Sequence, residues 1–135
     1  MFLSSFSIEK KYLFRDLSIY AAKADDDFGD DEKLIIDAHC AEMRIDNNNY
    51  VNDVSYDDTL SKIVEIYTPE ELRMAYLEVM SVLLADNDIS DMEDAFIEDI
   101  SEHFGMNNVD VDNAKRALFT LKKSYSMISE FISGK

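Results

Sequence analysis

The sequence has few residues that break helices and almost none that cross-link a chain. Its 135 residues include three Gly, one Pro and one Cys. A single Cys excludes both an intramolecular disulfide framework and a zinc site built on several cysteines. So few Gly and Pro leave little to interrupt regular secondary structure. The length fits one domain rather than two independent cores.

Positive charge is also scarce, because 13 Lys and Arg stand against 29 Asp and Glu, a formal net charge of −16. A protein that binds nucleic acid needs a dense face of Lys and Arg to neutralise phosphates. We therefore expect no direct binding of nucleic acid. The hydrophobic content of 47% still argues against a wholly disordered chain, despite the charge.

Long apolar runs are missing as well. No stretch approaches the roughly 18–20 apolar residues that span a bilayer. The apolar start, from Met1 to Phe6, is too short for a signal-peptide core and has no basic region before it. We expect a soluble cytoplasmic protein without a transmembrane segment, in which the lone Cys40 suits a reducing compartment.

The apolar residues that are present recur at three- and four-residue steps, as in Leu13, Leu17 and Tyr20, which is typical of helices. Alternating strand patterns are scarce. Helix starts carry capping signals, such as Thr68 followed by Pro69 and then Glu71. The pattern predicts an all-α, single-domain bundle of about six helices, with a longer loop over residues 47–53. The predicted helices cover residues 7–24, 30–45, 56–67, 69–85, 90–104 and 111–132.

Two acidic segments of the chain repeat at an offset of 61 residues. Residues 24–32 read Ala-Asp-Asp-Asp-Phe-Gly-Asp-Asp-Glu, and residues 85–93 read Ala-Asp-Asn-Asp-Ile-Ser-Asp-Met-Glu. Each segment joins two predicted helices, and the third helices correspond more faintly. We interpret the chain as a single domain over 1–135 built from two similar three-helix halves, approximately 10–67 and 71–128. A pseudo-twofold axis would relate the halves, each of which is too small to bury its apolar faces well by itself.

The repeated acids have two explanations, and the sequence leaves both open. In the first, Glu32 and Glu93 accept the backbone N–H of a helix cap, and acids in the first turn favour the helix dipole. In the second, the crowded carboxylates bind a divalent cation, since Ca²⁺, Mg²⁺ and Mn²⁺ take oxygen ligands. An EF-hand is excluded, because the twelfth position counted from Asp25 is Ile36 and from Asp86 is Ile97. The candidate metal ligands are Asp25, Asp27, Glu32, Asp86, Asp88 and Glu93.

This duplicated pattern resembles that of the tellurite-resistance TerB-like family, whose helix–turn–helix units carry Ala-Asp-Gly-x-Ile-x-x-x-Glu. The resemblance extends over roughly residues 10–130, with Asp26 and Asn87 in place of the family's Gly. It implies a helical fold and an acidic surface cluster proposed to bind metal. It also implies a link to stress or toxic-oxyanion resistance, with protein partners and a membrane-associated complex.

No motif predicts catalysis. Neighbouring residues on a helix point about 100° apart, so His39 and Cys40 do not form a dyad, and we expect an ordinary core or boundary position for Cys40. The sequence has no phosphate-binding Gly-rich loop and no nucleophile elbow, although local spacing cannot reveal a triad assembled in space. We expect no enzyme but a non-catalytic stress-response or scaffold domain. The alternative is an acidic protein-interaction module without a metal role, with DNA mimicry as its boldest form.

Overall fold

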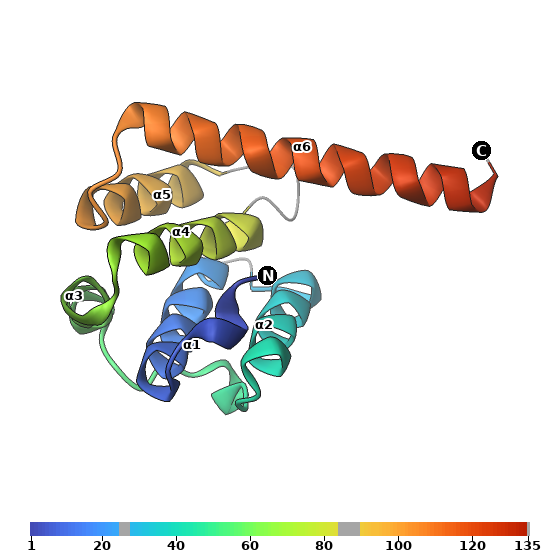
Figure 1. Cartoon of the computed structure of the whole chain (residues 1–135). Coiled ribbons are helices and arrows are strands. Elements are labelled where there is room, and N and C mark those ends of the chain that lie inside the picture. The colour runs from blue at the N-terminus through green and yellow to red at the C-terminus, as the bar shows by residue number, and fades with distance from the viewer. Residues whose placement is uncertain (25–27, 84–89, 135) are drawn as a thin grey trace. The chain divides into compact units, whose positions relative to one another are not determined.

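The computed structural model describes residues 1–24, 28–83 and 90–134. Within these ranges the chain forms six α-helices and two short 3-10 helices, and no strand (Figure 1). The all-α prediction is therefore confirmed. The elements are η1 (Leu3–Ser5), α1 (Ile8–Ala22), α2 (Asp30–Met43), η2 (Asn48–Tyr50), α3 (Tyr56–Ile66), α4 (Pro69–Leu83), α5 (Asp91–His103) and α6 (Asn108–Ser133).

The helix starts follow the side chains that can cap them. Thr68 Oγ1 accepts the N–H of Glu71, whose carboxylate accepts the N–H of Thr68 in return. At α6, Asn107 Oδ1 accepts the N–H of Asp110 at 2.8 Å, and Asp110 returns the hydrogen bond. This reciprocal cap explains why α6 begins three residues before its predicted start.

The sequence repeat is visible in the bounds of α1 and α4, but not in those of α3, with 11 residues, and α6, with 26. Both α1 and α4 have 15 residues, and the 61-residue offset takes Ile8 to Pro69 and Ala22 to Leu83. One ion pair joins equivalent positions of the two helices, since Lys10 Nζ lies 2.7 Å from Glu71 Oε1. The division of the whole chain into two similar three-helix halves stays a prediction.

The chain divides into two compact units, Met1–Gly105 and Met106–Lys135. In the first unit, α1 contacts α2, α3 and α4, while α5 contacts α3 and α4. Cys40 lies in this core as predicted, and its burial raises the pKa of the thiol to about 11. The single domain over 1–135 stays a prediction. The largest fully buried side chains are Leu3, Phe14, Leu17, Ile19, Ile36, Met43, Leu60, Ile63, Tyr76, Met80, Leu83 and Ile100.

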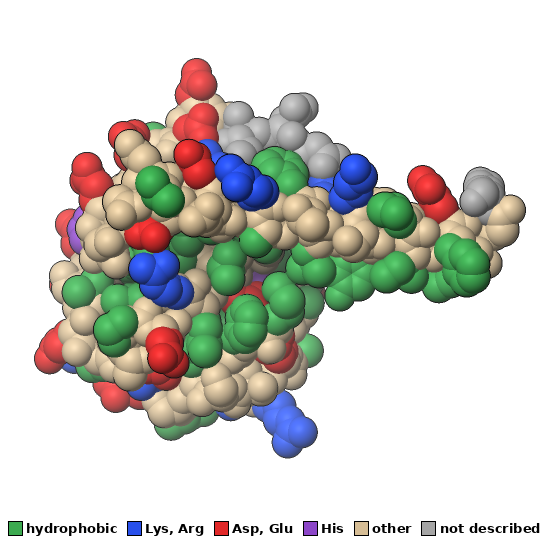
Figure 2. Space-filling view, turned by 45° about the horizontal axis from the view of Figure 1, so that its top comes forward, with side chains coloured by type: hydrophobic (Ala, Val, Ile, Leu, Met, Phe, Trp, Pro, Cys, Tyr) green, Lys and Arg blue, Asp and Glu red, His purple; other side chains and the backbone are tan. Residues whose placement is uncertain are grey.

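The second unit consists mainly of α6, a helix of 26 residues. Hydrophobic side chains gather along one side of α6 (Figure 2), and several of its apolar residues, such as Tyr125 and Ile128, are exposed. No helix among the described residues combines the length and apolar character needed to cross a membrane.

Candidate functional site

The two repeated turns use their last glutamate in the same way. Glu93 Oε1 accepts the backbone N–H of Ser90 at 3.1 Å, and Ser90 Oγ accepts the N–H of Glu93. In the first copy Glu32 Oε2 accepts the N–H of Gly29, also at 3.1 Å. Gly29 has no side chain, so only this half of the capping box forms at α2. The capping prediction is confirmed for Glu32 and Glu93.

The four aspartates of the candidate metal set lie outside the described residues. Asp25 and Asp27 belong to the first turn, and Asp86 and Asp88 to the second. Among the residues that the structure describes, no group of three or more His, Cys, Asp or Glu side chains is placed to hold a metal ion. A metal site at the acidic turns stays a prediction.

The loop between α2 and α3 is held against α1 by one buried arginine. The guanidinium of Arg15 lies 2.8 Å from Asp53 Oδ2 and 3.4 Å from Asp46 Oδ1, and it also donates to the backbone carbonyl of Asp46. The loop needs such support, because Arg44, Asn48, Asn49 and Tyr50 all have positive φ. Residues other than Gly rarely adopt this conformation.

Asp16, which follows Arg15, is only 2% exposed and holds the end of the same loop. Its carboxylate accepts the backbone N–H groups of Asp53 and Val54 at 3.2–3.4 Å. Burial raises the pKa of Asp16, and the hydrogen bonds from these two N–H groups oppose that shift. The carboxylate is thus partly desolvated at the place where α1, the loop and α3 meet.

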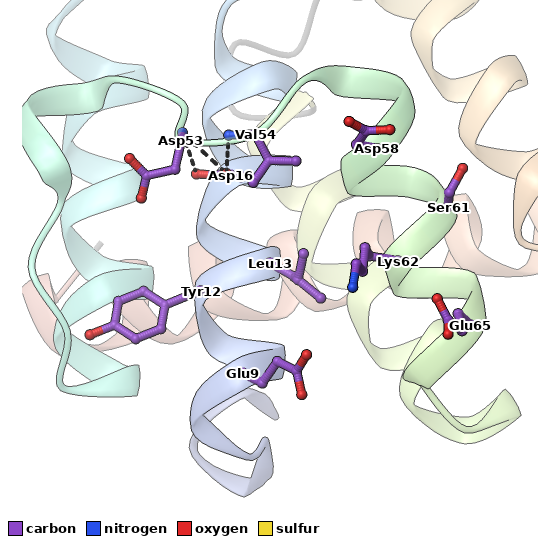
Figure 3. Close-up of a pocket in the computed structure, with 10 residues that line it drawn as sticks. All are labelled: Glu9, Tyr12, Leu13, Asp16, Asp53, Val54, Asp58, Ser61, Lys62 and Glu65. Carbon is purple, nitrogen blue, oxygen red and sulfur yellow. Dashed lines mark hydrogen bonds between the residues drawn. The ribbon is translucent and has the colours of Figure 1, made fainter.

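A cleft of about 600 Å³ opens between α1 and α3 next to Asp16. Figure 3 shows Leu13 and Lys62 pointing toward one another in its middle, with Glu9 and Glu65 at one end. Asp16, Val54 and Asp58 lie at the other end. Leu13 and Asp16 are buried and form the floor, whereas the acids at the rim are exposed. The lining residues are Glu9, Tyr12, Leu13, Asp16, Asp53, Val54, Asp58, Ser61, Lys62 and Glu65.

Charge in this α1–α3 cleft is strongly unbalanced. Five of its lining residues are acids and Lys62 is the one cation among those that the structure assigns to the cleft. Asp53 is paired with Arg15. Within the described parts of the chain, Glu9, Asp58 and Glu65 have no Lys, Arg or His nitrogen within 4.0 Å. Negative charge is thus in excess in the cleft, even with Lys62 counted, and this excess favours a further cation there.

A second polar cluster is buried between α1, α2 and α4. Ser18 Oγ lies 3.0 Å from His39 Nδ1, and His39 Nε2 lies 3.4 Å from Glu78 Oε2. The terminal ammonium of Met1 donates to Glu78 Oε1 at 2.6 Å and to Glu42 Oε1 at 2.8 Å. The order hydroxyl, imidazole and carboxylate matches a hydrolytic triad. However, Ser18 is 0% exposed, so no substrate reaches its hydroxyl in this structure.

The charge of Glu78 is stabilised by the donors around it. Burial alone would raise the pKa of Glu78, but hydrogen bonds from His39, the Met1 ammonium and the N–H of Phe2 outweigh it. They lower the pKa of this carboxyl to about 2. The same contacts raise the pKa of the Met1 ammonium against the opposing effect of its own burial. The ion pairs of this cluster therefore attach the start of the chain to α2 and α4.

Sequence reasoning missed both the buried cluster and the α1–α3 cleft. Ser18, His39 and Glu78 lie on three helices, so no local motif joins them. The sequence contains a weak indication of the cleft, because Glu9, Leu13 and Asp16 follow the i, i+4, i+7 spacing of one helix face. Asp58, Lys62 and Glu65 follow the same spacing on α3. Two such stripes become a site only once the helices that carry them pack together.

A family model described as "Tellurite resistance protein TerB" matches residues 46–116. The matched segment starts in the loop before α3 and ends within α6. It thus includes the second acidic turn but not the first. A search of curated proteins found no match, and no solved structure matched either.

Proposed function

This chain belongs to the tellurite-resistance TerB family, and on that premise we propose that it is a non-catalytic stress-response or scaffold domain that binds a divalent cation at its acidic turns. One observation carries the proposal. The acidic segment occurs twice, and Glu32 and Glu93 occupy equivalent positions at the starts of α2 and α5. A role in stress resistance and in a membrane-associated complex with protein partners follows from the family.

The donor chemistry of the turns suits a hard cation. Carboxylate oxygens are the preferred ligands of Ca²⁺ and Mg²⁺, and they suit Mn²⁺. The cap hydrogen bond at α2 uses one oxygen of Glu32, and a carboxylate has two, so capping and ligation by Glu32 are compatible. Asp25, Asp27, Asp86 and Asp88 would supply the remaining carboxylates.

The non-catalytic part of the proposal is supported by burial. The nearest approach to a catalytic arrangement among the described residues is Ser18, His39 and Glu78, whose exposed fractions are 0%, 6% and 4%. A nucleophile must reach its substrate, and this hydroxyl is enclosed by the core. Cys40, the other potential nucleophile, is 3% exposed with a raised pKa.

Titration calorimetry of the whole chain with Ca²⁺, Mg²⁺ and Mn²⁺ tests the metal site, together with the thermal midpoint Tm in each metal. We expect saturable binding and a Tm that rises with metal, since a ligand of the native state stabilises it. Asp86→Asn with Asp88→Asn should abolish the rise. The matched control is Asp57→Asn with Glu70→Gln, which removes the same charge from the first turns of α3 and α4.

A further variant separates ligation from capping. Glu93→Gln keeps an oxygen that can accept the N–H of Ser90 but removes the negative charge. It should weaken metal binding while leaving the metal-free Tm close to that of the unmodified chain. Two results would show that the turns serve only as caps. One is the absence of binding heat at millimolar metal, and the other is a control variant that loses the metal-dependent rise in Tm as fully as the Asp86→Asn, Asp88→Asn variant does.

A second candidate function is an acidic protein-interaction module without a metal role. The observation that favours it is that every described α-helix has an acidic residue in its first turn. Carboxylates are thus spread over the surface and could occupy the phosphate-binding face of a basic partner, as a DNA mimic does. A pull-down at low salt that recovers no basic protein would exclude this candidate.

A further inference from the structure

The α1–α3 cleft has a charge pattern that does not belong to the acidic turns. On α1 the stripe is Glu9, Leu13 and Asp16, and on α3 it is Asp58, Lys62 and Glu65. The two helices run in opposite directions past the cleft, so Glu9 faces the end that holds Glu65, and Asp16 the end that holds Asp58 (Figure 3). The cleft therefore has acid at both ends and an aliphatic floor between them.

The two acidic ends are separated by a distance that the helix geometry fixes. Asp16 follows Glu9 by seven positions, which is roughly 10 Å at about 1.5 Å of rise per residue. Leu13, which is 8% exposed, provides apolar surface halfway along. The volume of about 600 Å³ is within the range of small-molecule sites. A single metal ion could neutralise one end but could neither reach both nor cover the apolar floor.

We propose that the α1–α3 cleft binds a linear aliphatic diamine or polyamine, with one ammonium group at each acidic end and the methylene chain over Leu13. One ammonium group lies between Glu9 and Glu65, and the other next to Asp58, above the floor that Asp16 forms. The methylene chain lies along the middle of the cleft over Leu13, where it contacts apolar atoms that a simple ion would not, and this favours an amphipathic cation.

Lys62 gives the proposal its sharpest consequence. Its ammonium group belongs to the middle of the cleft and has no carboxylate within 4.0 Å among the described residues. Its positive charge repels any cation that enters the cleft, so the Lys62 side chain has to adopt another rotamer when the ligand binds. Removing this charge should therefore tighten the binding of a cationic ligand, whereas it would weaken the binding of an anion.

Titration of the intact chain with spermidine, followed by calorimetry and amide NMR shifts, tests the proposal. Exposed ion pairs contribute up to about fivefold each. We expect Glu9→Gln with Glu65→Gln to lower the affinity about five- to tenfold and Lys62→Gln to raise it about two- to fivefold. The control Asp57→Asn removes a carboxylate of α3 that does not line the cleft and should leave the affinity unchanged.

Three comparisons of ligands complete the test. Butylamine, which has one ammonium group, should bind more weakly than spermidine, and Mg²⁺ at equal ionic strength should not displace it. The proposal would be overturned if butylamine bound as tightly as spermidine or if Mg²⁺ displaced spermidine. It would also be overturned if Asp57→Asn lowered the affinity for spermidine as much as Glu9→Gln with Glu65→Gln does. Tighter binding of a short lysine peptide than of spermidine would also overturn it, since the occupant would then be a protein segment. Asp86→Asn tests the metal site separately, because it should leave spermidine binding intact.

Discussion

The buried cluster around Glu78 and the α1–α3 cleft both contain acidic side chains, but they differ in whether these carboxylates have partners within the protein. Glu78 is 4% exposed and receives hydrogen bonds from the Met1 ammonium and the N–H of Phe2, with His39 beside it. Glu9 and Glu65 are exposed and have no counter-charge within 4.0 Å in the described chain. A buried carboxylate must be satisfied internally for the protein to fold, whereas an exposed one remains available to a ligand.

The largest expected effect tests the buried side of this comparison. Glu78→Ala leaves His39 and the Met1 ammonium without their shared partner, so we expect a loss of about 3–5 kcal/mol in the free energy of unfolding. Urea unfolding measures it. The matched variant in the cleft, Glu65→Ala, should change the stability by less than about 0.5 kcal/mol. Similar losses in the two variants would show that burial does not distinguish the two sites.

A smaller effect appears when the pH is lowered. The folded-state pKa of Glu78 is about 2, below the ordinary value of 4.5, so its charge stabilises the native state above about pH 4.5. That contribution is lost as the pH falls from there toward 2. Asp16 acts in the opposite direction, because its pKa is raised in the native state. In Glu78→Gln the urea midpoint should therefore fall less steeply between pH 5 and 2 than in the unmodified chain. If it falls equally steeply, Glu78 is not the cause of the fall.

The smallest effect belongs to the cleft. Glu65→Gln removes one of several repelling carboxylates, so we expect the unliganded protein to gain a few tenths of a kcal/mol at low salt. The gain should vanish at about 0.5 M NaCl, because salt screens exposed charges. Chemical unfolding of both proteins at the two salt concentrations measures it. A loss of stability at low salt would instead indicate that Glu65 makes a favourable contact.

Local sequence patterns predict the helices, but they do not predict the sites that form where the helices pack together. Periodic apolar residues and caps such as Thr68 with Glu71 depend on neighbours in the chain, so the sequence predicts helix bounds to within a few residues. The loop at residues 47–53 was predicted, but the support it receives from Arg15 was not. That contact, like the pairing of His39 with Glu78, depends on which helices pack together, and the pattern of one helix does not contain this information.

The ion pair between Lys10 and Glu71 has a consequence for the way α4 begins. Glu71 Oε1 accepts hydrogen bonds from Lys10 Nζ, at 2.7 Å, and from the backbone N–H of Thr68, at 3.0 Å. Burial would raise the pKa of Glu71, but these hydrogen bonds outweigh it and lower the pKa. One carboxylate oxygen therefore both caps α4 and pairs with α1, so the start of α4 and its attachment to α1 are coupled, and a change at Glu71 affects both.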